Sequence, residues 1–412
     1  MTGRTRLAVV FDQGASSPLQ LKDTIGTQFE IVWVVDRNRP GPPSLLRLLG
    51  RLGPVVDITG CDVPTAVDLL RPEAPQGVIC FSDSCIAITA GLAQSLGLPA
   101  LSTDCAARLI DKFAQRTAFA AAGLDVPRFW RVPTGDDVAV DTVAGEATFP
   151  VVVKPEVGEG SRHTEPAFDA DSMRQMLRDA SAHGRDTIVE EMIVGDPDLP
   201  PELGDYVSVE SVVSAGQITH LIVTGRFPVA KPFRETGFFM PAILGDGLRD
   251  SVMQLATDAI TAVDFTVGST HTEIKLTPEG PRVIEINGRL GGGMADLLSL
   301  VSDVNLFELA GRVAVGEPVQ LSAPVETLAM SYLFYVQAPA SARQVMAIDG
   351  IDEFSHRDGV VEVRVNRPAG SAVNWRDGNH GNVFSVLGTT TGPTELLELA
   401  RAVEQKVTIS YD

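Results

Sequence analysis

The sequence predicts a protein of mixed α/β and α+β class that contains several domains. Its 412 residues exceed the length at which single hydrophobic cores stop growing, roughly 250–300 residues. Strand-like and helix-like segments alternate through the first hundred residues, as in a parallel sheet covered by helices. From about residue 130 onward, strands and helices follow one another without this alternation, which favours α+β order.

Residues 1–101 are predicted to form a doubly wound domain. Strand-like runs occur at Leu7–Phe11, Phe29–Asp36 and Gly77–Phe81, and helix-like stretches occur at Ser44–Leu52, Pro64–Leu70 and Ile86–Leu96. The first strand leads into Asp12-Gln13-Gly14-Ala15-Ser16 rather than into the G-x-G-x-x-G fingerprint of dinucleotide-binding folds. Nothing in this segment indicates an NAD or FAD site.

Residues 102–316 are predicted to form a central domain and residues 317–412 a small C-terminal domain. Ser102 is a good N-cap, and the Ala-rich stretch after it predicts one helix to Ala122, ended by Gly123. Central strands are predicted at Phe149–Lys154, Thr187–Glu191, Val207–Val213, Ile218–Thr224, Thr270–Leu276 and Arg282–Asn287, and helices at Asp171–Ala182 and Leu248–Ala262. The C-terminal domain is predicted to contain strands at Leu328–Val336 and Val360–Val365 and a helix at Pro393–Lys406.

The composition excludes several classes of protein. There are 33 Lys and Arg residues against 53 Asp and Glu, and the net charge of −20 repels nucleic acid and anionic lipid. No apolar run approaches the roughly 20 residues that cross a bilayer, and no secretory signal follows the first residues. The 4 cysteines form no C-x-x-C pair, which favours reduced, buried thiols. We expect a cytoplasmic protein without nucleic-acid or membrane partners.

The most specific feature is a predicted β-hairpin formed by Thr270–Leu276 and Arg282–Asn287, whose arms alternate polar and apolar residues. A turn symmetric about Glu279 would place Glu273 opposite Glu285. The same register would pair His271 with Asn287 and Lys275 with Val283 on that face, and would turn Ile274, Ile284 and Ile286 into a core.

The two glutamates of this hairpin would repel each other, because paired Cβ atoms lie about 5 Å apart. A divalent cation would relieve the repulsion, and two carboxylates with the amide oxygen of Asn287 suit Mg²⁺ or Mn²⁺. A solvated polar face, with Lys275 neutralising a glutamate, is the alternative. Arg289 and the bend Gly291-Gly292-Gly293 follow directly, so a cation able to stabilise a transferred phosphoryl group would lie beside the metal.

Two lysines and a glycine-rich loop could bind phosphate groups. Lys154 ends an apolar strand, and the loop Val157–Thr164 follows it, with Gly160 and Ser161 near its centre. The loop is not a Walker A motif, and a lone loop of this kind is more often a hairpin turn. Lys112 lies in a helical stretch, where it would more often be an ordinary surface charge.

The pair Glu190-Glu191 ends another apolar strand. Because consecutive strand residues face opposite sides, one glutamate can point into a cleft while the other stays in solvent. An acidic strand end without a function is the alternative.

In this order and spacing, the segments resemble the ATP-grasp superfamily of carboxylate–amine ligases over essentially the whole chain. The resemblance rests on Gly97-Leu-Pro, Asp111-Lys112-x-x-x-Arg116, Val153-Lys154-Pro155 with the glycine loop, Glu190-Glu191-x-Ile193-x-Gly195, His271-Thr-Glu273 and Glu285-Ile-Asn287-x-Arg289. Within the superfamily, the hairpin and the run after it look most like bacterial L-amino-acid ligases. The fold implied is an ATP-grasp core between a doubly wound domain and a small C-terminal domain, with residues 125–195 as the lobe that covers the nucleotide.

The resemblance implies ATP and two Mg²⁺ ions as cofactors, with Mn²⁺ as a substitute. Lys112 and Lys154 would hold the phosphates under the loop of Gly160 and Ser161, and Arg289 would be the catalytic residue. The adenine would be held by Glu190, Glu191, Met192 and Ile193, and the metal ligands would be Glu273, Glu285 and Asn287. The reaction implied is phosphorylation of a carboxylate to an acyl phosphate, followed by attack of an amine to give an amide.

The sequence departs from the family pattern in two places. An insertion at residues 196–205 displaces the acid expected to bind the ribose, which leaves Asp198, Glu202 and Asp205 as candidates. The glycines after Arg289 would leave space for a larger substrate. Candidate substrate-binding residues are Arg226, Arg234, Glu235, His271, Gly292 and Gly293, although the first three equally suit an ordinary charged loop.

Small-molecule carboxylate and amine substrates are expected, and the resemblance implies a homodimer. Two alternatives stay open. One is an ATP-grasp ligase with another acceptor, such as bicarbonate, a nucleotide-precursor amine or a diamine. The other is a nucleotide-binding regulatory protein that has lost turnover.

Overall fold

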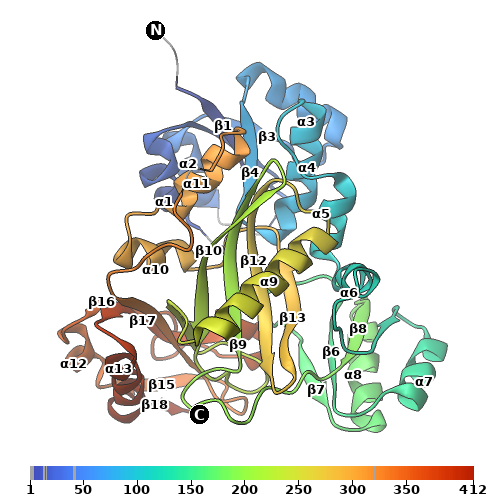
Figure 1. Cartoon of the computed structure of the whole chain (residues 1–412), viewed down its shortest axis with the longest axis vertical. Helices are drawn as coiled ribbons and strands as arrows, with labels where there is room; N and C mark the ends of the chain where they lie inside the picture. The colour runs from blue at the N-terminus through green and yellow to red at the C-terminus, as the bar shows by residue number, and fades with distance from the viewer. Residues whose placement is uncertain (1–3, 13, 15, 40–42, 320) are drawn as a thin grey trace.

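The computed structural model describes residues 4–12, 14, 16–39, 43–319 and 321–412. Figure 1 shows the N-terminal α/β layer at the top, long central strands below it, and two flanking bodies at the base. The element order confirms the predicted mixture of α/β and α+β structure.

The N-terminal sheet is parallel and has the strand order β3-β2-β1-β4. Its strands are β1 (Arg6–Phe11), β2 (Glu30–Val35), β3 (Val55–Asp57) and β4 (Gly77–Cys80), and its helices are α1 (Pro18–Asp23), α2 (Pro43–Leu52), α3 (Val63–Leu70) and α4 (Ile86–Ser95). Strands β1 and β2 are buried along nearly their whole length, as expected for a sheet covered on both faces. Strand β3 was not predicted, because it is only three residues long.

The single helix predicted from Ser102 to Ala122 is wrong. The structure contains α5 (Thr103–Ile110) and α6 (Lys112–Ala121), separated by Asp111 in an extended conformation. Asp111 is the N-cap of α6, because its carboxylate accepts a hydrogen bond from the Ala114 N–H at 2.9 Å. The break places Lys112 at a helix N-terminus, where its backbone N–H donates to the Glu156 carbonyl at 3.0 Å.

Residues 125–195 contain a separate four-stranded antiparallel sheet with the order β5-β8-β6-β7. The strands are β5 (Phe129–Val132), β6 (Val151–Pro155), β7 (Glu165–Ala167) and β8 (Thr187–Glu191), and the helices α7 (Asp137–Glu146) and α8 (Ala170–Ala182) pack on one face. Val151, Val153 and Leu177 belong to a core of its own. The glycine-rich loop joins β6 to β7, so it projects from the end of this sheet.

An eight-stranded sheet, ordered β13-β12-β9-β10-β11-β14-β17-β16, runs through the rest of the molecule. Its strands are β9 (Tyr206–Ser214), β10 (Gln217–Arg226), β11 (Gly237–Met240), β12 (Gly268–Thr277), β13 (Gly280–Asn287), β14 (Met330–Gln337), β16 (Val360–Val365) and β17 (Asn382–Thr390). Helix α9 (Asp246–Ala262) lies across one face (Figure 1). The short strand β11, which was not predicted, pairs with both β10 and β14 and makes the sheet continuous past residue 317. The domain limits at 101 and 316 stay predictions.

The remaining elements complete the two ends of the molecule. The helices α10 (Met294–Val301) and α11 (Leu306–Ala314) share one core with the N-terminal sheet, in which Leu298 and Phe307 join Leu7 and Trp33. Beside the C-terminal strands lie the pair β15 (Val345–Asp349) and β18 (Thr408–Tyr411) and the helices α12 (Ile351–Ser355) and α13 (Pro393–Lys406).

The predicted hairpin register is confirmed near its open end and wrong near its turn. Glu273 pairs with Glu285, and His271 pairs with Asn287. The register then shifts, so that Ile274 pairs with Val283 and Lys275 with Arg282. Ile284 has no partner in this register and is the extra residue of a β-bulge. The residues of β13 between the bulge and the turn therefore face the side opposite to the predicted one. Val283 is therefore buried in the core, and Ile284 lines the cavity instead.

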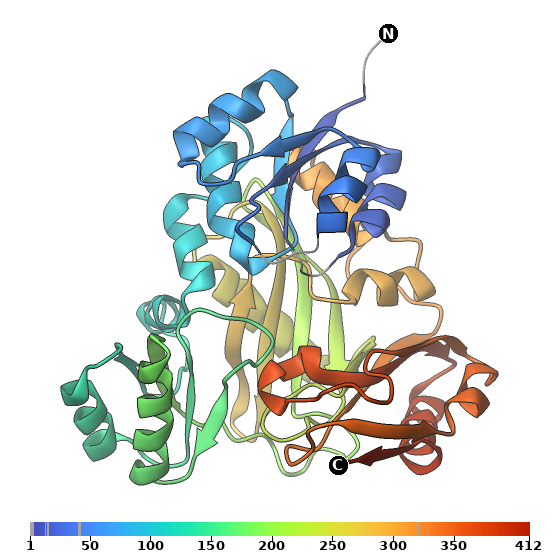
Figure 2. The same ribbon diagram turned by 180° about the vertical axis from the view of Figure 1, so that it is seen from behind.

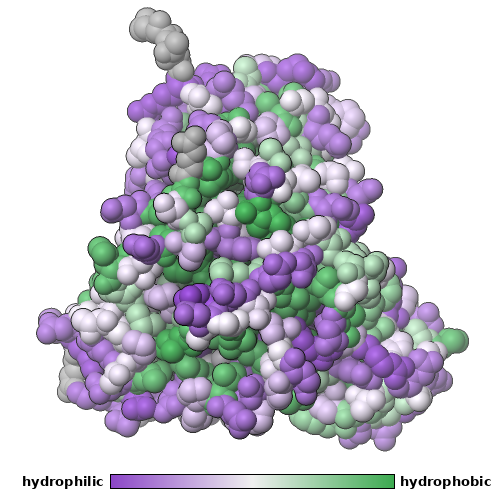
Figure 3. Space-filling view, viewed as in Figure 1, coloured by the Kyte–Doolittle hydropathy of each residue, from purple (hydrophilic) through white to green (hydrophobic). Residues whose placement is uncertain are grey.

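Hydrophilic and hydrophobic side chains are mixed on the face shown in Figure 3. Within the described part of the chain, no helix is both long enough and apolar enough to cross a membrane. All the cysteines are unpaired, and Cys80, Cys85 and Cys105 are buried, as predicted, whereas Cys61 is half-buried. Burial raises the pKa of Cys85 to about 11 and keeps it as a thiol.

Candidate active site

A cavity of about 390 Å³ lies where the lobe of residues 125–195, the central sheet and the C-terminal segment meet. This volume falls within the usual range of ligand pockets. The predicted site residues in its lining are Lys112, Lys154, Gly160, Ser161, Glu190, Glu191, Met192, Ile193, Arg226, Glu235, His271, Glu273, Glu285, Asn287, Arg289 and Gly292. Segments more than 170 residues apart in the chain therefore contribute to one cavity.

Two predicted substrate residues do not line the cavity. Arg234 is buried, and its guanidinium donates to the backbone carbonyls of Lys231 and Ala338. Gly293 lies at the N-terminus of α10 with a positive φ of 76°, and a side chain there would press against Leu333 and Phe238. The structure therefore gives neither residue a place in the cavity lining.

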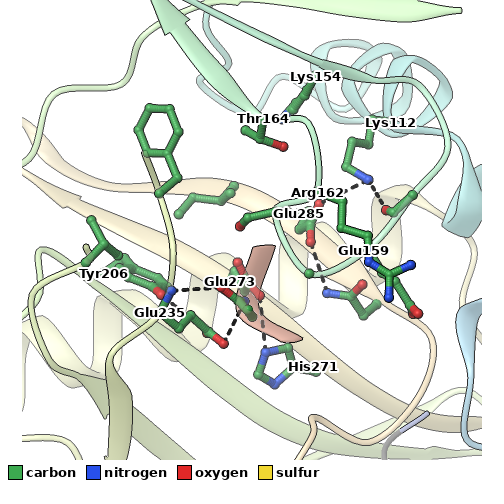
Figure 4. Close-up of a pocket in the computed structure, with 18 of the residues that line it drawn as sticks. Lys112, Lys154, Glu159, Arg162, Thr164, Tyr206, Glu235, His271, Glu273 and Glu285 are labelled. Atoms are coloured by element: carbon green, nitrogen blue, oxygen red, sulfur yellow. Dashed lines mark hydrogen bonds and ion pairs between the residues drawn. The ribbon is translucent and has the colours of Figure 1, made fainter. Parts of the chain in front are cut away.

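The two hairpin glutamates face each other across β12 and β13 and point into the same space (Figure 4). The Asn287 side-chain amide donates to Glu285 Oε1 at 3.4 Å, and Lys112 Nζ lies 3.8 Å from Glu285 Oε2. Glu273 Oε1 lies 3.4 Å from His271 Nε2. Burial alone would raise the pKa of Glu273, but its contact with His271 and two nearby arginines outweigh burial and lower that pKa to about 2.

This arrangement has the chemistry of a magnesium site that a ligand completes. In the described residues, no three His, Cys, Asp or Glu side chains form a cluster able to hold a metal ion. The set instead contains two carboxylates and one amide oxygen on adjacent strands. Mg²⁺ commonly binds through one or two carboxylates and shares the rest of its coordination with waters and substrate phosphates. The residues present therefore fit Mg²⁺ brought in with a polyphosphate.

Glu190 lies between two buried cations on the lobe side of the cavity. Lys154 Nζ is 2.8 Å from Glu190 Oε2, and Arg116 Nε is 2.8 Å from Glu190 Oε1. Burial opposes ionisation of Glu190, but Arg116 and Lys154 outweigh it and lower the pKa of Glu190 to about 2. Its neighbour Glu191 turns outward, where its Oε1 accepts from the Thr148 N–H at 2.9 Å. Glu190 is therefore buried and Glu191 partly exposed, but both line the cavity, so the second glutamate does not simply stay in solvent as predicted.

The glycine-rich loop folds over the cavity and is tied to Lys112. The ammonium group of Lys112 donates to the Gly158 carbonyl at 2.5 Å (Figure 4). Gly158 and Gly160 adopt positive φ angles of 156° and 65°, which glycine accepts at little cost. Ser161 has a φ of 55° and His163 a φ of 54°, so the loop also holds ordinary residues in a left-handed conformation. Such conformations are common in segments that clamp ligands.

Sequence reasoning missed two acidic residues beside Arg289. Asp83, in the short 3-10 helix η3 (Asp83–Cys85), accepts hydrogen bonds from the guanidinium through Oδ2. Glu159, in the glycine loop, has its pKa raised to about 7 by burial and by the nearby carboxylate of Asp83. No local pattern could have revealed Asp83, because it lies 206 residues from Arg289 in the chain.

The far end of the cavity contains a second network, centred on Arg226. Arg226 is 1% exposed, and its guanidinium donates to Ser208 Oγ at 3.0 Å and lies 3.4 Å from Glu235 Oε1. His271 Nδ1 lies 2.8 Å from Glu210, a fully buried acid that sequence analysis also missed. Burial alone would lower the pKa of His271, but Glu210 and Glu273 outweigh it and raise that pKa to about 9. Buried charges of both signs therefore line this end.

Of the three acids considered for ribose binding, Asp205 is the one placed in the cavity lining among the described residues. Its Oδ1 lies 2.7 Å from Lys275 Nζ, and its carboxylate packs so closely on Gly195 that a side chain there would collide with it. Glu202 instead pairs with Arg401 at 2.7 Å. The Asp198 backbone N–H donates to the side chain of Asp196 at 2.9 Å, within the inserted segment.

Residues 109–293 match the ATP-grasp domain family, and this stretch includes most of the residues just described. This part of the chain is therefore an ATP-grasp domain, as the resemblance predicted, and the whole chain has the fold of the ATP-grasp ligases.

Comparison with individual proteins adds detail to this class. The crystal structure of an L-amino acid ligase from Bacillus licheniformis superposes with a TM-score of 0.77, 21% identity and coverage of 100% of both chains, which establishes a shared fold. The uncharacterized protein y4rH of Sinorhizobium fredii is 27% identical over 340 residues, which is 80% of this chain and 67% of that protein. Carnosine synthase 1 of Mus musculus is 26% identical over 281 residues, which is 62% of this chain. The match covers 32% of that synthase, so the chain spans about a third of its length.

Proposed function

We propose that this chain is an ATP-dependent ligase that forms an amide bond between a small carboxylate, such as an amino acid, and an amine. The observation that carries the proposal is the placement of Glu273 opposite Glu285 in one cavity with Lys112, Lys154 and Arg289. The names of the relatives support ligation of this kind, since they include a carnosine synthase and, by fold, an L-amino acid ligase.

The proposed reaction proceeds in two steps. A carboxylate oxygen of the first substrate attacks the γ-phosphorus of ATP, ADP leaves, and an acyl phosphate forms. The amine nitrogen of the second substrate then attacks the acyl carbon and loses a proton, and phosphate leaves with one oxygen of the original carboxylate. Arg289 would stabilise negative charge on the transferred phosphoryl group and then on the tetrahedral intermediate.

The other cavity residues would bind and orient the nucleotide. Lys112 and Lys154 would contact the phosphates, with the loop of Gly160 and Ser161 folded over them. The backbone of Glu191, Met192 and Ile193, together with Glu190, would hold the adenine, and Asp205 would accept hydrogen bonds from the ribose. Glu273, Glu285 and Asn287 would hold two Mg²⁺ ions, which when bound neutralise charge on the phosphates.

The substrates would bind at the far end, near Arg226, Glu235, His271 and Gly292. Arg226 offers a fixed positive charge for a carboxylate, and Glu235 offers a carboxylate for an ammonium group. Burial raises the pKa of Glu235, so an incoming cation would favour its ionised form.

A product screen tests this proposal. The full chain is incubated with Mg²⁺, ATP and pools of amino acids, other carboxylates and amines, and products are identified by mass spectrometry while phosphate release is followed. We expect a product whose mass equals that of two pool members minus water, with one phosphate released for each. Arg289→Ala should lower this turnover by about a hundredfold or more, the cost of removing one charge-stabilising donor.

Two results of the same screen would contradict the proposal. A product formed from bicarbonate in place of an organic carboxylate would assign another reaction within the same fold. Nucleotide binding without phosphate release for any pair of substrates would favour a regulatory role without turnover.

A further inference from the structure

The C-terminal segment η4 (Trp375–Gly381) reaches the cavity beside the glycine-rich loop that follows β6. Asn379 and His380 of this segment line the cavity, and so does Asn382 just after it. In Figure 2 the red C-terminal ribbon lies beside the loop that joins β6 to β7. Two segments more than two hundred residues apart therefore close over the same space.

The contact between η4 and the glycine loop is made backbone to backbone. The Asn379 N–H donates to the Gly160 carbonyl at 3.0 Å. Gly378 has a φ of 62°, and a side chain at this position would collide with the Gly160 carbonyl oxygen. Only glycine allows η4 to approach the loop this closely. The sequence therefore specifies this close approach through the glycine at position 378.

The side chain of Asn379 makes a second, separate contact with Glu235. Its Oδ1 accepts from the Glu235 N–H at 2.8 Å, and its Nδ2 donates to Glu235 Oε2 at 2.9 Å. The oxygen and the nitrogen of the Asn379 side-chain amide thus both bond to Glu235. The other oxygen, Glu235 Oε1, accepts from the Tyr206 hydroxyl at 3.3 Å and faces Arg226. Asn379 therefore belongs to the network at the substrate end of the cavity.

We propose that Asn379 is a positioning residue that couples closure of the glycine loop over the nucleotide to the ordering of Glu235 at the substrate end. The inference rests on the proposed function, because it takes the glycine loop as the nucleotide cover and Glu235 as a substrate residue. Gly160, Asn379 and Glu235 form one hydrogen-bonded unit, in which the loop contact uses the backbone of Asn379 and the acid contact uses its side chain.

The coupling has a thermodynamic consequence. A ligand that orders the loop also orders Asn379 and Glu235, so a second ligand binds to a site that has already lost part of its conformational entropy. Nucleotide and substrate should therefore each tighten the binding of the other by the same factor. Such factors commonly lie at about 5- to 150-fold.

Hydrogen–deuterium exchange with Mg²⁺ and a non-hydrolysable ATP analogue tests the link without turnover. In the unmodified protein, the nucleotide should slow exchange in peptides that cover 158–164. It should also slow exchange at least about fivefold in peptides that cover 234–237. The quantity compared between variants is the ratio of exchange rates with and without nucleotide. A variant that only loosens the protein changes both rates and leaves this ratio similar.

Two variants break the link from opposite sides. Asn379→Ala keeps the backbone bond to Gly160 but removes both bonds to Glu235, whereas Gly378→Ala blocks the loop contact and keeps the Asn379 side chain. Both should retain nucleotide protection of 158–164 and lose the transmitted protection of 234–237. Gln344→Ala is the control, because it removes an amide that bonds the Gly370 carbonyl elsewhere in the C-terminal region and should keep both effects.

The outcomes separate this inference from the proposed function. Loop protection in the unmodified protein without protection of 234–237, or protection of 234–237 that survives in either variant, would overturn the role of Asn379 alone. No nucleotide protection of 158–164 in the unmodified protein would contradict the proposed function and the coupling with it.

Discussion

The carboxylate of Asp83 holds the guanidinium of Arg289, with Oδ2 accepting from Nη2 at 2.7 Å and from Nε at 3.1 Å. Asp83 comes from the N-terminal sheet layer, and Arg289 follows the end of β13. The group that would stabilise the transition state is therefore oriented by a part of the chain outside the ATP-grasp segment.

Asp83→Ala should lower kcat by up to about a hundredfold, because misplacing a catalytic group by 1 Å can cost that much. The KM for ATP should change little, since Asp83 lies outside the lining of the cavity. Steady-state kinetics on the substrate pair found by the screen would measure both values. Asp68→Ala, which removes an exposed acid from α3 of the same sheet layer, is the control. An unchanged kcat for Asp83→Ala would show that Arg289 does not need this partner.

Glu285→Gln should abolish most of the metal-dependent turnover while leaving the protein folded. The substitution removes the charge that would neutralise Mg²⁺ and alters no part of the hydrophobic core. Phosphate release titrated with Mg²⁺ would measure the loss, and circular dichroism would check the fold. Glu279→Gln, at the exposed turn of the same hairpin, should behave like the unmodified protein. Equal phosphate release from both variants would contradict the metal assignment.

Glu190→Gln should destabilise the protein by about 3–5 kcal/mol, because it leaves Arg116 and Lys154 buried without a counter-charge. Glu191→Gln, one residue further on, should cost less than about 1 kcal/mol, since Glu191 is partly exposed. Urea denaturation of both variants would measure the difference. Similar free energies of unfolding for the two would show that Glu190 is not the buried counter-ion described here.

The ion pairs of Glu190 with Arg116 and Lys154 also predict a pH dependence of stability. The folded protein lowers the pKa of Glu190 to about 2, below its ordinary value near 4.5. The stabilisation is therefore fully present above about pH 4.5 and is lost as the pH falls towards 2. Denaturation between pH 6 and pH 3 should show a steeper loss for the unmodified protein than for Glu190→Gln. Parallel curves would contradict the pKa shift.

Closure of the glycine loop should weaken as the pH rises. The closed loop buries Glu159 and places it near Asp83, which together raise the pKa of Glu159 to about 7, so closure favours the protonated form. This contribution is complete below the ordinary pKa near 4.5 and is lost as the pH passes 7. In the nucleotide-free protein, proteolysis at 158–164 should increase from pH 6 to pH 8, and Glu159→Gln should remove that dependence. An identical dependence in the variant would assign it to another group.

Much of the fold and of the candidate site could be predicted from local patterns. The alternation of polar and apolar residues was enough to place Glu273 opposite Glu285. The bulge at Ile284 was not predicted, because the order of polar and apolar residues along the strand does not show where a residue lacks a partner. Asp111 was not predicted as an N-cap, because the residues on both sides of it have a helical composition.

The partners of the predicted residues could not be predicted, because tertiary structure alone brings them together. Asp83 and Asn379 lie outside the segment that carries the motifs, and neither stands in a recognisable pattern. Arg234 was predicted as a site residue but does not line the cavity. Its charge suggested a substrate contact, but nearby backbone carbonyls satisfy its guanidinium. A charged residue in a loop indicates a site only once its partners are known.

Transfer of isotopic oxygen tests the central claim most directly. A carboxylate substrate labelled with ¹⁸O in both oxygens is converted with Mg²⁺ and ATP, and the released phosphate is analysed by mass spectrometry. Formation of an acyl phosphate predicts that one ¹⁸O atom appears in each phosphate, together with ADP. Unlabelled phosphate, or label recovered in AMP with release of pyrophosphate, would contradict the mechanism proposed for this cavity.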